Sequence, residues 1–278
     1  DIGVCELIGG PANPEPVRAY ASRPSRETDV EEEVAVCRDY HDEYGIGAFK
    51  FKIGKRLGFD TDEDEWPGRT ESIVSGVRIG LDDDVDVLVD ANGGFSPDRA
   101  IEVGTEVLDP NGVIHFEEPC PYWELDWTAR VRDGVDVPVA GGEQDNMFRH
   151  WAKQWERIIE TPVLDIVQPD VGYVGGLTRA KQITDLAATH GLPAVPHSPN
   201  HTLLKVFTLH LPAAIDNPGP YPFEWRDKAW HHSPRTEGLY DPEPTIDDGA
   251  LAVPEGPGWG VEIGRDWLGE ARIDRSEA

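Results

Sequence analysis

The sequence is poor in cysteine and methionine, with three cysteines and one methionine among 278 residues. Cys5, Cys37 and Cys120 lie far apart, are odd in number and form no CxxC pair, so the sequence shows neither a zinc signature nor a disulfide framework. Unpaired cysteines suit a reducing cytoplasm, which is the location we expect. No run of about 18 consecutive apolar residues exists to span a bilayer.

Basic residues are also scarce. The chain has 25 lysines and arginines against 53 aspartates and glutamates, a formal net charge of −28. Such a polyanion repels phosphate backbones and anionic lipid, so neither nucleic acid nor a membrane surface is expected as a partner. Only seven of the basic residues are lysines. This composition resembles that of halophilic proteins, and we interpret most acidic residues as solvated surface groups.

Short β-branched or apolar runs alternate with segments of helical spacing along most of the chain. The helical segments include Glu31–Tyr44, Pro97–Leu108, Arg149–Glu160 and Leu177–His190, and Ser96 is a suitable N-cap for the second. Eight strands, each followed by a helix, over about 250 residues predict an α/β fold, a TIM-like (β/α)₈ barrel. The predicted strands are Val17–Ala21, Ala48–Ile53, Val85–Asp90, Val113–Glu117, Val137–Gly141, Val163–Gln168, Pro193–Pro196 and Pro222–Glu224.

Polar residues recur at or just after the carboxyl ends of the predicted strands. Repeating βα units would bring these residues to one rim of the barrel, where barrel enzymes keep their active sites. The alternative is chance, because the residues were chosen for their chemistry. Successive members are 26 or 27 residues apart: Asp90, Glu117, Glu143, Asp170, His197 and Glu224.

The second predicted strand carries two lysines. In Ala48–Ile53, a period of two places Lys50 and Lys52 on one face and Phe49 and Phe51 on the other. In a barrel both ammonium groups would point into the mouth; the alternative is an amphipathic strand with its lysines in water. Repulsion of about 2.5 kcal/mol between charges roughly 6.5 Å apart is expected to lower the pKa of one lysine toward that of a general base.

Three acids end successive strands: Asp90, Glu117 and Glu143. On one rim they would repel one another strongly unless a cation sat among them. An all-oxygen ligand set with open positions suits Mg²⁺, at one ion per site. For each acid taken alone, the alternative is a helix N-cap or a solvated carboxylate. Glu118, beside Glu117, is expected to face the opposite way and to have a structural role.

A second proton-transfer group is expected across the barrel. Asp170 follows the sixth strand and His197 the seventh, so the carboxylate can hold one imidazole nitrogen and raise the basicity of the other. Glu224 ends the eighth strand and could donate a hydrogen bond if protonated. An ordinary exposed glutamate is the alternative for that position.

These residues resemble the enolase superfamily and, within it, the mandelate racemase-like subgroup, also called the mandelate racemase/muconate lactonizing enzyme family, which includes acid-sugar dehydratases. The resemblance spans most of the chain in order and spacing. The matching motifs are Lys50-Phe51-Lys52, Asp90-Ala91-Asn92, Glu117-Glu118-Pro119, Gly142-Glu143, Pro169-Asp170 followed by Gly175-Gly176, and His197.

The resemblance implies a metal site and a set of proton-transfer groups. It implies Mg²⁺ held by the three acids above and by a substrate carboxylate, stabilising the dianion that forms when an α-proton leaves. Lys52 would move the proton on one face, with Lys50 lowering its pKa and assisting the substrate carboxylate. His197, oriented by Asp170, would act from the other face.

The resemblance alone implies roles for two further residues. Asn92 is implied to contact a substrate hydroxyl, and Glu224 to hydrogen-bond the enediolate. The expected activity is that of a hydro-lyase of carbohydrate catabolism, which converts an aldonate or aldarate into a 2-keto-3-deoxy acid. The alternatives are a racemase or epimerase of a 2-hydroxy acid, which uses the same two bases, and an inactive or binding-only barrel. The resemblance also implies a homo-oligomer.

The chain departs from the family at its start. Members begin with an α+β capping domain, whereas this sequence opens near the point where that domain ends, so we expect that the sequence omits the domain or that the protein has lost it. Residues 1–16 are expected to be a remnant of the linker between cap and barrel. Residues 17–238 form the expected barrel, and 239–278 a C-terminal segment that would pack on the capping domain.

Overall fold

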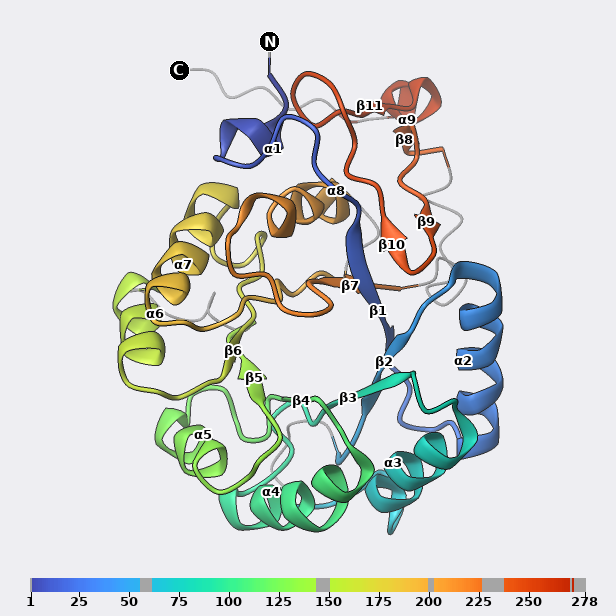
Figure 1. Ribbon diagram of the computed structural model, residues 1–278, viewed down its shortest axis with the longest axis vertical. Coiled ribbons are helices and arrows are strands. Elements are labelled where there is room, and N and C mark those ends of the chain that lie inside the picture. The colour runs from blue at the N-terminus through green and yellow to red at the C-terminus, as the bar shows by residue number, and fades with distance from the viewer. Residues whose placement is uncertain are drawn as a thin grey trace.

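The computed structural model describes residues 2–55, 62–143, 151–199, 203–226, 238–270 and 272. In Figure 1 a ring of strands occupies the centre of the molecule and helices surround it, which confirms the predicted (β/α)₈ barrel. The described strands of the ring are β1 (Val17–Arg23), β2 (Ala48–Lys52), β3 (Asp86–Asp90), β4 (His115–Glu117), β5 (Val139–Gly141), β6 (Ile166–Val167) and β7 (Phe223–Trp225).

Parallel pairing runs around the ring. Neighbours pair from β1 through β6, and β7 pairs with the other edge of β1. Between β6 and β7 the ring is closed by isolated bridges, in which Ala194 pairs with Val167 and with Pro218. The sequence predicts a strand over Pro193–Pro196, and the structure has only this bridge. Proline has no N–H to donate to a ladder, which explains the shorter pairing.

Helices cover the outside of the ring. α2 begins after Asp29, whose side chain caps it, and Ser96 caps α4 as predicted by accepting a hydrogen bond from the Arg99 N–H. The single helix predicted over Pro97–Leu108 is an α-helix that continues as a π-helix. The helices are α2 (Val30–Tyr44), α3 (Arg69–Gly80), α4 (Pro97–Val103), the π-helix η1 (Gly104–Leu108), the 3₁₀ helix η2 (Asp109–Asn111), α5 (Leu125–Arg132), α6 (Trp151–Glu160), α7 (Leu177–Thr189), α8 (Leu203–Leu209) and the 3₁₀ helix η4 (Pro212–Ala214).

Apolar side chains form one layer outside the strands and another inside. Phe49 and Phe51 of β2 belong to the larger cluster, which packs the strands against the helices. The smaller cluster lies inside the barrel, below the carboxyl ends of the strands. Ala48 and Leu88 each lie two residues before a site residue on the same strand, so their side chains point to the same inner face. The barrel interior is therefore apolar below the strand ends and polar at the mouth. The smaller cluster consists of Tyr20, Ala48, Leu88, Ala140, Ile166, Val195 and Tyr221.

The C-terminal segment packs on the barrel itself. Its strand β10 (Ala250–Leu251) pairs antiparallel with the start of β1 and with β9 (Ile246–Asp247). A second pair, β8 (Tyr240–Asp241) with β11 (Glu262–Ile263), lies near α9 (Arg265–Glu270) on the same side of the ring as the short N-terminal helix α1 (Val4–Leu7) (Figure 1). Among the described residues, no helix combines the length and the apolar character needed to cross a bilayer.

Candidate active site

Both lysines of β2 lie inside the barrel mouth, as the alternation predicts. Lys50 is 1% exposed and Lys52 is 8% exposed. The Nζ atom of Lys50 donates hydrogen bonds to both carboxylate oxygens of Glu117, at 2.8 and 2.7 Å, and to the Tyr20 hydroxyl at 3.3 Å. The Nζ atom of Lys52 donates to Oδ2 of Asp90. Each ammonium group is thus held by a carboxylate from the neighbouring part of the sheet.

The electrostatic setting of Lys50 differs from the predicted one. Its Nζ atom also lies 3.6 Å from Oε1 of Glu224 and 4.0 Å from Oδ2 of Asp90. Burial alone would lower the pKa of Lys50, but Glu117, followed by Glu224, outweighs burial and raises the pKa well above its ordinary value. The carboxylates therefore dominate the electrostatic setting of Lys50, where the prediction considered only repulsion between the two lysines.

Asp90 and Glu117 occupy adjacent positions at the ends of paired strands. They are direct partners in the register of β3 and β4, as Lys52 and Asp90 are in β2 and β3. Glu117 is completely buried and also accepts hydrogen bonds from Nε2 of Gln168, at 2.8 Å, and of His115, at 3.2 Å. Burial would raise the pKa of Glu117, but Lys50 and then His115 outweigh burial and hold it well below its ordinary value.

Glu143 and His197 are in direct contact at the barrel mouth. The Nε2 atom of His197 lies 3.1 Å from Oε2 of Glu143, and Nδ1 lies 2.8 Å from Oδ2 of Asp170. Asp170 is itself held by the main-chain N–H groups of Gly172 and Tyr173, at 2.7 and 3.0 Å. The predicted placement of Asp170 beside one imidazole nitrogen is therefore present in the structure.

The two groups titrate far from their ordinary ranges. Burial would lower the pKa of His197, but Glu143, the hydrogen bond to Asp170 and the charge of Glu224 raise it to about 9. Burial raises the pKa of Glu143 to about 7, although His197 opposes this shift. The surrounding carboxylates therefore favour the protonated imidazole, which can act as an acid.

Glu224 connects the two sides of the mouth. Its Oε1 atom lies 3.6 Å from Nζ of Lys50, and its Oε2 atom lies 3.8 Å from Nε2 of His197. Arg226 donates to Oε1 at 3.1 Å. Burial would raise the pKa of Glu224, but Lys50 and then Arg226 hold it far below its ordinary value. The sequence suggested a protonated hydrogen-bond donor or an exposed glutamate; the structure has a buried, charged acceptor, because three cations surround it.

Asn92 lies two residues after Asp90 and is held against it. Its Nδ2 atom donates to Oδ2 of Asp90 at 3.0 Å, and its main-chain N–H donates to Oδ1 at 2.6 Å. The residue has a φ of 46°, in the left-handed region that asparagine tolerates. The side chain of Asn92 is therefore fixed at the mouth, where its predicted contact with a substrate hydroxyl stays a prediction.

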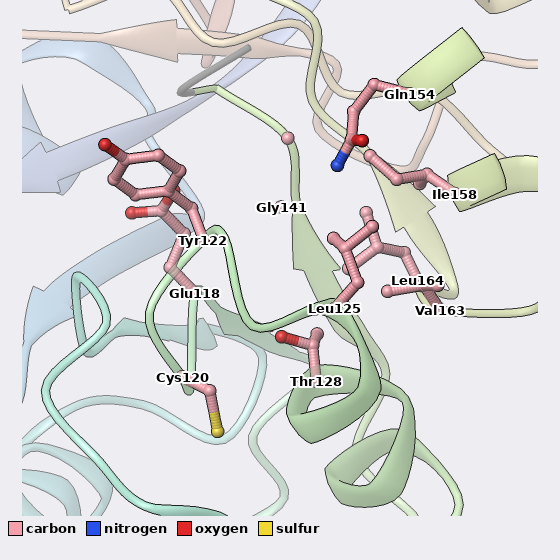
Figure 2. Close-up of a pocket in the computed structure, with 11 residues that line it drawn as sticks. Glu118, Cys120, Tyr122, Leu125, Thr128, Gly141, Gln154, Ile158, Val163 and Leu164 are labelled. Atoms are coloured by element: carbon pink, nitrogen blue, oxygen red, sulfur yellow. The ribbon is translucent and has the colours of Figure 1, made fainter. Parts of the chain in front are cut away.

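Glu118 is buried beside the site. It lines a small recess between β5 and the helices α5 and α6. Figure 2 shows the apolar side chains of Leu125, Ile158 and Leu164 across the recess from Glu118. Among the residues that the structure describes, its Oε1 atom has no hydrogen-bond partner. Burial, followed by the charge of Glu143, raises the pKa of Glu118 well above its ordinary value.

The three expected metal ligands are each engaged by a cation. Asp90 holds Lys52, Glu117 holds Lys50, and Glu143 faces His197. In the described part of the chain no three acidic, histidine or cysteine side chains are gathered closely enough to hold a metal ion. The assignment of Asp90, Glu117 and Glu143 as ligands stays a prediction.

The charge of the mouth nevertheless fits a divalent cation. Buried carboxyl groups outnumber the cationic side chains, and two of the carboxyl groups have raised pKa values. All of the expected ligand atoms are oxygens, which suits Mg²⁺. A divalent ion would offset the excess negative charge. The carboxyl groups are Asp90, Glu117, Glu118, Glu143, Asp170 and Glu224, and the cationic groups are Lys50, Lys52, Arg226 and His197.

Four residues of this network were missed from the sequence. Three of them lie two residues from a predicted site residue on the same strand or strand end: His115 before Glu117, Gln168 before Asp170, and Arg226 after Glu224. Because a period of two keeps such neighbours on one face, alternation could have identified these three. Nothing in the spacing identified the fourth, Tyr20, which reaches Lys50 from β1.

The chain is similar to known proteins over most of its length. The chain is 31% identical over 274 residues to the D-galactarolactone cycloisomerase of Agrobacterium fabrum, covering 96% of this chain and 68% of that protein. It is 29% identical over 266 residues to the arabinonate dehydratase of Saccharolobus solfataricus, covering 94% and 64%. The chain thus spans about two thirds of the length of these relatives.

The fold and the family agree as well. A crystal structure of a proposed racemase from Roseobacter denitrificans superposes with a TM-score of 0.91 at 43% identity, covering 99% of this chain and 73% of that one. Residues 32–267 match the family model described as enolase C-terminal domain-like. The chain therefore belongs to the enolase C-terminal domain-like family of the enolase superfamily.

Proposed function

We propose that the chain is the catalytic barrel of a Mg²⁺-dependent dehydratase of a sugar acid. The observation that carries this proposal is a pair of proton-transfer groups, each held by its own carboxylate: Lys52 against Asp90, and His197 against Asp170. Glu224 lies between the two sides, near both Lys50 and His197. Related proteins named as a sugar-acid dehydratase and a sugar-lactone cycloisomerase support the choice of substrate class.

Asp90, Glu117 and Glu143 are the residues that would hold the metal ion. When bound, Mg²⁺ supplies electrostatic stabilisation of the negative charge that develops on the substrate carboxylate as the α-proton leaves. Lys50, whose ammonium group is held between Glu117 and Glu224, adds a fixed positive charge on the same side of the mouth. The substrate carboxylate is therefore expected to bind toward Lys50.

Lys52 and His197 share the proton transfers. Lys52, acting as the neutral amine, takes the α-proton of the sugar acid and becomes an ammonium group held by Asp90. His197, in its protonated form, donates its Nε2 proton to the departing β-hydroxyl, which leaves as water. The enol that remains takes up a proton at C3 and releases the proton of its C2 hydroxyl, which gives the 2-keto-3-deoxy acid. Asp170 keeps the imidazole oriented, and Glu224 accepts a hydrogen bond from Arg226 and lies near Lys50 and His197.

A racemase or epimerase of a 2-hydroxy acid is the second candidate. It is favoured by the same two groups, which reach the mouth from separate segments of the ring and could act on opposite faces of one carbon. The structural relative from Roseobacter denitrificans also carries a racemase name. In this reaction no hydroxyl departs, so the protonated His197 would return a proton to the α-carbon.

A substrate screen separates these functions. The protein is incubated with a library of aldonates and aldarates, with Mg²⁺ and high salt, and products are assayed with semicarbazide and by NMR in D₂O. Dehydration yields a keto acid that reacts with semicarbazide, whereas racemisation yields a C2 epimer carrying solvent deuterium. If no acid in the library shows Mg²⁺-dependent loss of its α-proton, both proposals fail.

A further inference from the structure

The main chain just beyond Lys52 is held by side chains from outside β2. The carbonyl oxygen of Lys52 accepts a hydrogen bond from Nη1 of Arg69 at 2.5 Å. The N–H of Gly54 donates to Oγ1 of Thr70 at 3.0 Å, and the carbonyl oxygen of Gly54 accepts from Nε of Arg26 at 3.2 Å. Side chains from the β1–α2 loop and from the start of α3 thus clamp this turn.

Arg69 is an unusual member of this clamp because its guanidinium is buried. The residue is 1% exposed, and Nη1 and Nη2 donate to main-chain carbonyl oxygens, those of Lys52 and, at 3.2 Å, Ser25. Burying a charged group is unfavourable unless its hydrogen bonds are satisfied. The planar fork of an arginine can hold two carbonyl groups in a fixed geometry, which a lysine cannot. Arg69 therefore ties the end of β2 to the β1–α2 loop.

Arg26 is also linked to the side chain of Lys52, through Asn92 and Asp90. Its Nη2 atom donates to Oδ1 of Asn92 at 2.9 Å, and Nδ2 of Asn92 donates to Oδ2 of Asp90 at 3.0 Å. That oxygen also receives the ammonium group of Lys52. One arginine thus holds both the main chain after Lys52 and, through Asn92, the carboxylate on which the side chain rests.

We propose that Arg69 and Arg26 are positioning residues that fix Lys52 at the distance and angle required for proton transfer at the α-carbon. The proposal rests on the proposed function for the role of Lys52, and on geometry alone for the clamp. Lys52 needs such support because it is the last residue of β2 and carries a flexible four-carbon side chain. A displacement of about 1 Å in a reacting group can lower a rate about 100-fold.

The first test compares two arginines of the same helix. Arg69→Met removes the clamp, whereas Arg78→Met removes a matched pair of hydrogen bonds at the far end of α3, where Arg78 donates to the carbonyl oxygens of Val85 and Asp82. We expect Arg69→Met to lower kcat about 10- to 100-fold with KM within about threefold of wild type. Arg78→Met should leave both constants unchanged. Equal kcat values in the two variants would overturn the proposal.

A conservative variant separates positioning from charge. Arg69→Lys keeps the positive charge and loses the planar fork, so kcat should fall nearly as far as in Arg69→Met. Full recovery of kcat in Arg69→Lys would instead assign Arg69 a role as a buried counter-charge, and would overturn the positioning role.

The second test needs no turnover. Reductive methylation with formaldehyde, followed by peptide mass mapping, reports the reactivity of buried Lys52 relative to Lys153, whose side chain is 79% exposed. We expect this ratio to rise in Arg69→Met and in Arg26→Met but not in Arg78→Met. An unchanged ratio in both clamp variants would overturn the proposal. The methylation ratio could rise as expected while the substrate screen detects neither dehydration nor racemisation. That combination would reject the proposed function but would still support the positioning of Lys52 by the two arginines.

Discussion

The imidazole of His197 lies between two carboxylates with different expected roles. Its Nε2 atom is 3.1 Å from Glu143, an expected metal ligand, and its Nδ1 atom is 2.8 Å from Asp170, an orienting group. A proton on Nε2 is therefore directed toward Glu143. Because of the same contact, His197 and a metal ion are expected to compete for Glu143. A substitution of either residue should therefore alter metal binding.

The variant His197→Asn should lose turnover and keep metal binding. Removing a general acid typically lowers kcat about 10²- to 10⁴-fold. Because Glu143 also loses its competing cation, calorimetric titration should show Mg²⁺ binding at least as tight as in wild type. His190→Asn, at an exposed position after α7, is the matched control and should behave as wild type. Turnover by His197→Asn at the parent rate would show that the acid role is wrong.

Magnesium should stabilise the fold through Asp90. A ligand that binds only the native state at 100 times its Kd adds about 2.7 kcal/mol to the free energy of unfolding. We expect Tm to rise with Mg²⁺ concentration in wild type and in Asp133→Asn, whose side chain is 74% exposed, and the rise to be lost in Asp90→Asn. An equal Mg²⁺-dependent rise in all three proteins would refute the assigned metal site.

His210 should make the attachment of the C-terminal segment sensitive to acid. Its Nε2 atom lies 3.2 Å from the carbonyl oxygen of Trp259, and burial lowers the pKa of this histidine. A depressed pKa means that the unfolded chain binds the proton more readily, so stability is present above about pH 6.5 and is lost as pH falls below it.

The measurement is the free energy of unfolding from pH 8 to pH 5, followed by tryptophan fluorescence. His210→Gln can still donate a hydrogen bond to the Trp259 carbonyl but does not titrate in this range. Wild type should therefore lose more stability than His210→Gln as the pH falls. Parallel losses in the two proteins would be inconsistent with a titrating His210.

Salt should stabilise the protein through its surface charge. At a net charge of −28, carboxylates repel one another across the folded surface, and about 1 M salt shortens the screening length to about 3 Å. We expect Tm, measured by calorimetry, to rise as KCl increases from about 0.1 M to about 2 M. A neutral solute at the same osmolality should raise Tm less. A fall in Tm with KCl would argue against the halophilic interpretation of the composition.

The sequence by itself determined the strands that carry the site and the direction of the lysines. Alternation in β2 predicted that Lys50 and Lys52 face inward while Phe49 and Phe51 pack under the helices, and the structure has this arrangement. Such predictions succeed because a period of two is a local property of an extended chain. The same rule would have added His115 to the site had it been applied two residues back from Glu117.

Only the tertiary structure decided the charge states and the contacts between strands. The pKa of Lys50 is raised because Glu117 and Glu224, 67 and 174 positions further along the chain, meet its ammonium group, and no local pattern encodes that meeting. The clamp on Lys52 by Arg69 has the same origin. Coulomb energy and hydrogen bonding depend on separations in space, which the order of residues constrains only after the ring has closed.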